Sequence, residues 1–165
     1  MRLPIVDEND ILIDYKDKQE RLPSEISRVS GLWVTDKDGN ILLAQRGLNK
    51  KNHPGLWGPA VAGTVEEGES YEDNIIKEAE EEIGLTGMKL SLGPKLRKSS
   101  NHEYFVQWFT TTIRHDFPFK KEDREVEKIQ WFSRGELGKL LKEKPEIFLP
   151  DFYKYLEIFN NENKS

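Results

Sequence analysis

The first apolar positions of the chain form two short groups that predict a β-hairpin. Residues 5–6 and 11–13 are apolar, and the polar segment 7–10 lies between them. A polar stretch then continues to residue 27. We therefore expect residues 1–27 to form an N-terminal hairpin and a linker.

Two further apolar runs predict a pair of strands. Residues 29–35 and 41–44 are rich in apolar side chains, and Asp38-Gly39-Asn40 between them is a typical turn sequence. The segment 49–59 contains two prolines and two glycines, which predicts a loop.

The pattern changes to the 3.6-residue period of an amphipathic helix over 70–83, and Gly84 predicts its end. On such a helix the expected core-facing residues are Ile75, Ile76, Ala79 and Ile83. Later patterns predict strands over 103–113 and 126–132 and helices over 133–141 and 150–159. Strands and helices in this mixed order predict an α/β sandwich with a mixed sheet.

Three carboxylates of the predicted helix have an unfavourable arrangement. Glu78, Glu81 and Glu82 are surface neighbours on the side roughly opposite the apolar residues. They repel one another, and acidic residues in a last helical turn also oppose the helix dipole, at a cost of about 0.3–1 kcal/mol each. A divalent cation would reverse both penalties, and oxygen ligands favour Mg²⁺ or Mn²⁺ over zinc.

Composition narrows the possible functions. The chain of 165 residues has 25 Lys and Arg against 30 Asp and Glu, so its net charge of −5 argues against binding a nucleic-acid polymer. It contains no cysteine, which excludes disulfides, thiolate metal sites and a cysteine nucleophile. With no recognisable leader or membrane-length apolar run, we expect a soluble, cytoplasmic protein that does not insert in membranes.

Glycine and glutamate residues, with a few flanking residues, occur at fixed spacing in and around the predicted helix. They are Gly63, Glu69, Lys77-Glu78-Ala79, Glu81-Glu82 and Gly84-Leu85. This spacing resembles the 23-residue signature of the Nudix hydrolase superfamily, with one departure: Lys77 stands where the family has arginine. Lysine keeps the charge but lacks the two-pronged guanidinium, so a looser pairing with Glu69 is expected.

The resemblance implies a Nudix-type α/β/α sandwich with a mixed β-sheet and an N-terminal hairpin. We expect one domain over 1–165, with a frayed end at 160–165. The resemblance also implies one to three Mg²⁺ ions, replaceable by Mn²⁺, held by the Gly63 carbonyl and by Glu78, Glu81 and Glu82.

The segments 45–50 and 54–57 resemble the branch that includes isopentenyl-diphosphate isomerase. In that branch the positions of Arg46 and Lys50 contact the diphosphate of the substrate, in agreement with the affinity of cations for phosphate. Trp57 is a candidate stacking platform for an organic group.

Isomerase chemistry is disfavoured by the residues at its key positions. Ala62 stands where the isomerase has its proton-donating cysteine, and Thr64 replaces a metal-binding histidine. Only Glu103 matches an acidic isomerase residue. The sequence therefore favours metal-dependent hydrolysis of a diphosphate linkage in a nucleoside diphosphate derivative or a similar small diphosphate. Isomerisation and ligand binding without turnover are the alternatives.

The sequence leaves the general base open. Glu82 and Glu81 are candidates on the helix, Glu125 is a candidate in a loop, and Glu103 is a candidate on a strand. The expected partner is a small diphosphate, and the N-terminal hairpin and C-terminal aromatic helix are candidate contacts of a homodimer.

Overall fold

The computed structural model describes residues 1–162, with side chains up to Asn160. Nine strands form one sheet. They are β1 (Arg2–Val6), β2 (Leu12–Asp17), β3 (Ile26–Thr35), β4 (Ile41–Arg46), β5 (Trp57–Pro59), β6 (Val61–Thr64), β7 (Ser91–Ser99), β8 (Glu103–Thr112) and β9 (Val126–Phe132). The helices are α1 (Tyr71–Ile83), α2 (Arg134–Glu143) and α3 (Phe152–Glu162), with short 3₁₀ turns η1 (Lys18–Glu20) and η2 (Pro145–Ile147).

Strand β3 is the centre of the sheet. It pairs in parallel with β8 along its whole length and antiparallel with β1, β4 and β6. The parallel β3–β8 pair among antiparallel neighbours makes the sheet mixed, as the sequence predicts.

Strands β3 and β4 separate soon after the turn that joins them. They pair only at Val34–Leu42 and Thr35–Ile41. Beyond this point β6 pairs with β3, whereas β5 and β9 pair with β4. The sheet thus opens between the two sets of strands, and this opening positions the candidate site.

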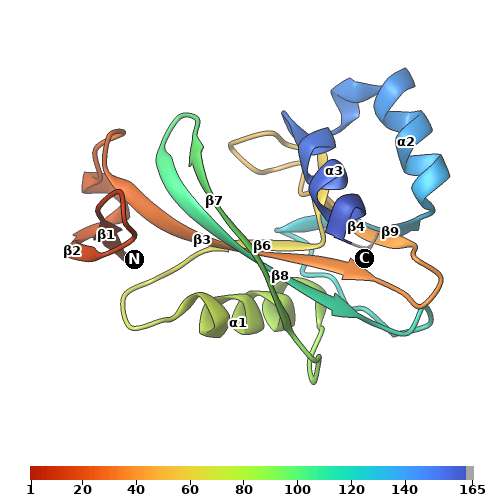
Figure 1. The fold of residues 1–165 in the computed structure, drawn as a ribbon, viewed down its shortest axis with the longest axis horizontal. Helices are drawn as coiled ribbons and strands as arrows, with labels where there is room; N and C mark the ends of the chain where they lie inside the picture. The colour runs from red at the N-terminus through yellow and green to blue at the C-terminus, as the bar shows by residue number, and fades with distance from the viewer. Residues whose placement is uncertain (163–165) are drawn as a thin grey trace.

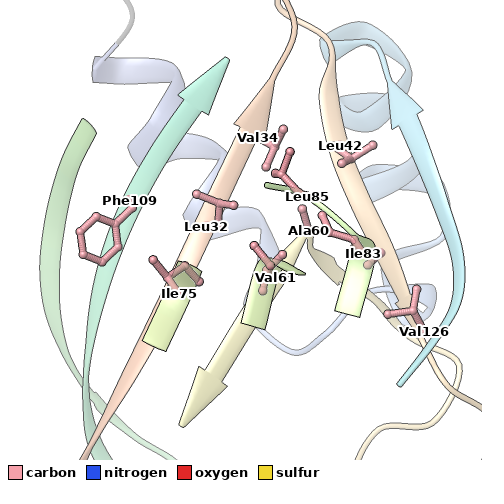
Figure 2. Close-up of a cluster of buried hydrophobic side chains, with 12 residues drawn as sticks. Leu32, Val34, Leu42, Ala60, Val61, Ile75, Ile83, Leu85, Phe109 and Val126 are labelled. Carbon is pink, nitrogen blue, oxygen red and sulfur yellow. The ribbon is translucent and has the colours of Figure 1, made fainter. Parts of the chain in front are cut away.

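Helices cover both faces of the sheet, with α1 on one face and α2 and α3 on the other (Figure 1). Because strand side chains alternate, β3 directs Leu32 and Val34 toward α1 and Trp33 toward α3. Figure 2 shows the first cluster, in which Ile75 and Ile83 of α1 meet residues of β3, β4, β8 and β9. The α/β/α sandwich expected from the sequence is therefore confirmed.

The predicted hairpin, strands and helices all form, with longer bounds for several strands. One expectation about secondary structure is wrong. The loop predicted over 49–59 ends earlier, because Trp57–Pro59 is a strand paired with β4. The expected frayed segment 160–165 overlaps α3, which extends to Glu162, and residues 163–165 lie outside the described part of the chain.

Two strands have no clear signal in the sequence. Strand β6 is only four residues long and contains Gly63. Strand β7 contains Gly93-Pro94, and its pairing with β8 shifts register between Leu92 and Lys95. Glycine and proline inside a strand argue against strand formation from sequence, and here they mark a bulge.

None of the helices in residues 1–162 has the length and apolar character needed to cross a membrane.

We expect Gly31→Ala to reduce the free energy of unfolding by about 1–3 kcal/mol. A Cβ at Gly31 would lie 2.7 Å from Cζ3 of Trp108, a buried ring that cannot move freely. Urea unfolding followed by circular dichroism measures the change.

Gly138→Ala is the matched control, because a Cβ at this position in α2 meets no atom within 4 Å. Alanine favours a helix interior over glycine, so this variant gains up to about 1 kcal/mol. Equal losses in the two variants would contradict the packing argument.

Candidate active site

A cavity of about 370 Å³ lies at the opening between β3 and β4. Its walls come from β4, from the β5–β6 segment, from α1 and from the start of β9. Three carboxylates line it, from Glu78, Glu82 and Glu125. Arg46 and Lys50 line it as well, so residues far apart in the sequence meet here.

Local interactions fix both ends of α1. The Ser70 side chain accepts a hydrogen bond from the Asp73 backbone N–H, and the Asp73 carboxylate accepts one from the Ser70 N–H. This reciprocal capping box satisfies free donors at the helix start. At the other end Gly84 has a φ of 67°, the left-handed conformation that glycine adopts readily. The predicted C-terminal stop is therefore present.

Glu78 and Glu82 of α1 lie beside its apolar stripe and not opposite it, which corrects the sequence-based expectation for these two residues. Ile75, Ala79 and Ile83 are buried, but Ile76 is 46% exposed. Glu78 and Glu82 are one helical turn apart and half-buried, whereas Glu81 is exposed. At 100° per residue, Glu82 is nearer to the apolar stripe than Glu81 is. Two of the three glutamates are therefore drawn into the protein.

Gly63 allows Glu78 to reach the cavity. A Cβ at Gly63 would lie 2.5 Å from Cγ and 2.9 Å from Cδ of Glu78. Gly63 is paired with Ser30 in the sheet and cannot easily move away. A side chain at this position would therefore displace Glu78.

Lys77 ties α1 to the loop that precedes it. Its Nζ donates to Oε2 of Glu66 at 2.7 Å and to Oε1 of Glu69. Burial alone lowers the pKa of Lys77, but these two carboxylates raise it above its ordinary value. The Glu69 carboxylate also accepts a bond from Nδ2 of the buried Asn74 at 2.8 Å. The looser pairing expected from lysine is not what the contacts show, since Lys77 engages two carboxylates at once.

The cavity carboxylates are electrostatically crowded. Burial raises the pKa of both Glu78 and Glu82. Contact with Glu78 and the charge of Glu125 raise the pKa of Glu82 further, to about 9, and the opposing effect of Lys50 is smaller. At neutral pH this pair therefore favours holding a proton, which a cation could replace.

Lys50 lies across the cavity from α1. Its Nζ donates to Oε2 of Glu125 at 2.5 Å. Backbone bonds hold the surrounding loop, from the Gly47 N–H to the Glu125 carbonyl and from the Gly55 N–H to the Arg46 carbonyl. The Arg46 side chain donates to the Asn52 carbonyl at 3.0 Å and makes no ion pair with any carboxylate up to residue 160.

Two residues predicted for the site lie elsewhere. Glu103 accepts bonds from Arg97 at 3.0 Å and from Ser99 at 2.5 Å and does not line the cavity. The Trp57 ring packs edge-on against Phe132, with centroids 5.3 Å apart, in the core beside α2 and α3. The strand pairing of β5 turns this ring away from the cavity.

A second acidic wall adjoins the cavity and has little signal in the sequence. An adjoining hollow of about 490 Å³ contains Glu81, Glu122 and Arg124 in addition to Glu78, Glu82 and Glu125. The Glu122 N–H donates to the Glu82 carbonyl at 2.8 Å, so this loop covers the end of α1. The acidic stretch before β9 is its signal in the sequence, and Glu125 is the one residue of that stretch predicted for the site.

The donor set suits a hard divalent cation, although its members are not fully assembled. Among the side chains of residues 1–160, no three His, Asp or Glu groups converge closely enough to hold a metal ion as they stand. Glu78 and Glu82 are a close pair, and Glu81, Glu122 and Glu125 line the same region. All of these side chains offer oxygen donors, the type that Mg²⁺ and Mn²⁺ prefer.

Comparison with solved structures supports the fold. A Deinococcus radiodurans protein superposes with a TM-score of 0.75 at 18% identity, covering 87% of this chain and 90% of that one. A MutT protein from Methanosarcina mazei gives a TM-score of 0.71 at 22% identity and covers 88% of this chain and 100% of that one.

Sequence relatives agree. An uncharacterised Nudix hydrolase of Yersinia pestis is 27% identical over 96% of this chain and 85% of its own length. The isopentenyl-diphosphate Delta-isomerase of Salmonella arizonae is 29% identical, but the match spans only 49% of this chain and 50% of the isomerase. Residues 26–155 match the NUDIX domain family. The chain therefore belongs to the Nudix hydrolase family.

Proposed function

We propose that this protein hydrolyses a diphosphate linkage in a nucleoside diphosphate derivative or a similar small organic diphosphate, with Mg²⁺ or Mn²⁺ as cofactor. One observation carries the proposal. The half-buried pair Glu78 and Glu82 lines the same cavity as the cations Arg46 and Lys50. Carboxylates hold a metal and cations hold phosphate, so both halves of a metal–diphosphate complex have matching ligands.

In this proposal Glu78 and Glu82 are the main metal ligands, and Glu81 and the Gly63 carbonyl complete the set. When bound, the cation neutralises charge on the diphosphate and promotes ionisation of the attacking water. Lys77 and Glu69 do not touch the substrate; they hold the loop against α1.

Glu125 is the proposed general base. It lines the cavity but is not a member of the Glu78–Glu82 pair, and Lys50 orients its carboxylate. As the water oxygen bonds to phosphorus, Glu125 accepts the proton and the bridging P–O bond breaks. Arg46 and Lys50 stabilise the negative charge on the phosphate groups.

Hydrolysis is favoured over isomerisation by the residues that surround the diphosphate site. Ala62 and Thr64 line the cavity where the isomerase requires cysteine and histidine. Glu103, the remaining acidic match, is engaged by Arg97 outside the cavity.

We expect Glu82→Gln to lower kcat by at least about 100-fold. The amide removes a charged metal ligand while preserving the size of the side chain. Phosphate release in Mg²⁺ from a panel of nucleoside diphosphate derivatives and prenyl diphosphates measures the effect.

Glu80→Gln is the control, because Glu80 is exposed on the same helix. It removes an equal charge and changes kcat less than twofold. Equal turnover by Glu82→Gln and the natural protein would refute the proposed function. Tight ligand binding with no product would favour a non-catalytic role.

We also expect the metal-free protein to lose stability as the pH rises from about 5 to 8. The pKa of Glu82 rises on folding from 4.5 to about 9. Over this interval the folded protein binds a proton that the unfolded chain releases, so the free energy of unfolding falls with rising pH.

Thermal unfolding in EDTA measures this dependence, and Glu82→Gln flattens it. Mg²⁺ stabilises the natural protein more at pH 8 than at pH 6, because its binding displaces the proton. The same slope in Glu82→Gln and the natural protein would mean that other groups control the dependence.

A further inference from the structure

The candidate active site continues into a second hollow of about 630 Å³ that is lined by cations. Lys18, Arg46 and Lys50 line both this hollow and the acidic cavity. Lys51 lines only the second hollow. The two spaces therefore share a wall and form one region with an acidic end and a basic end.

Three separate segments build the basic end. Lys18 comes from the η1 turn, Lys51 comes from the loop after β4, and Asn101 and His102 come from the β7–β8 turn. The amides of Asn49 and Asn52 lie in the same wall. Every one of these side chains can donate a hydrogen bond, and no Asp or Glu lines this hollow.

Most of these cations make no ion pair with the described carboxylates. In the described part of the chain, Lys50 alone among them forms an ion pair, with Glu125. Lys18, Arg46 and Lys51 form none with the carboxylates of residues 1–160. Acidic residues outnumber basic ones in this protein, whose net charge is −5. A group of cations without ion-pair partners is therefore not expected from its composition.

The surroundings of His102 also carry excess positive charge. Burial lowers its pKa first, and the charges of Arg21 and Lys18 lower it further. The Nε of Arg21 is itself buried without a hydrogen-bond partner among the residues that the structure describes. Arg21 does not line the hollow, but an anion there would relieve its repulsion with His102 and Lys18 and accept bonds from Lys18, Lys51 and His102.

We propose that this hollow is a second phosphate subsite, so that the preferred substrate carries a phosphate group beyond the diphosphate that is cleaved. Lys51, together with His102, determines this preference. The inference rests on the proposed function, which places the cleaved diphosphate between the α1 carboxylates and Arg46. The two hollows adjoin. The additional phosphate of the substrate is therefore either the next group in the same phosphate chain or a phosphate ester on a nearby carbon of the substrate.

Binding of defined phosphates tests the subsite. The probes are pyrophosphate, tripolyphosphate and adenosine 3′-phosphate 5′-diphosphate, measured by calorimetry in Mg²⁺ on the full chain with Glu82→Gln to prevent turnover. Tripolyphosphate represents a continuous phosphate chain, and the nucleotide represents a detached phosphate. We expect at least one of them to bind about tenfold more tightly than pyrophosphate.

Adding Lys51→Gln reduces this preference to about twofold or less, and Lys51→Arg retains most of it. Lys139→Gln is the matched control, because it removes the same charge from an α2 side chain that is 73% exposed. Circular dichroism verifies that each variant is folded.

Three outcomes would overturn the subsite: no binding of tripolyphosphate or the nucleotide, similar affinity for all three probes, or an equal loss of affinity for all three in Lys51→Gln. Failure of the proposed function has a different signature. In that case Glu82→Gln would not reduce hydrolysis, while the binding preference that depends on Lys51 would persist.

Discussion

The packing of α1 against β6 is the constraint on which the candidate site depends. Asn74, Glu78 and Glu82 occupy successive turns of the helix, beside the buried Ile75, Ala79 and Ile83. Burying the apolar stripe therefore also draws a polar stripe partly out of water, against the cost of desolvating charge. The protein accommodates Asn74 with bonds to Ser30, Thr64 and Glu69. Glu78 and Glu82 instead remain crowded, and in the proposed mechanism a bound cation relieves this crowding.

Position 77 shows that an ion pair can be preserved through different geometry. Arginine presents a planar fork, whereas the single ammonium group of lysine must direct its donors to separate acceptors. Lys77 does this by contacting Glu66 as well as Glu69. Because Glu69 also bonds to Asn74 and to the Glu66 N–H, the loop is linked to the helix at several points.

The sequence was most informative where local chemistry determines structure. The ends of α1 follow from Ser70 and Gly84, and the alternation in β8 separates Trp108 from Phe109 onto opposite faces. Sequence spacing placed Glu78 and Glu82 correctly on one helix, but the partners of these residues depend on tertiary pairing. Nothing local to Glu103 reveals that Arg97 draws it away, or that the β5 pairing turns Trp57 into the core. For the same reason, the turn that carries His102 could not be linked to Lys51 before the sheet topology was known.

The topology also has a consequence for when the site can form. The contact between Lys50 and Glu125 joins residues 75 positions apart, and the parallel pairing of β3 with β8 joins Ile26 to Glu103. Contacts between distant residues require large loops to close and are associated with slow folding. During synthesis, α1 can be complete well before β8 and β9 leave the ribosome. Until β9 arrives, Lys50 lacks its Glu125 partner, so the proposed phosphate site is among the last parts of the structure that the nascent chain completes.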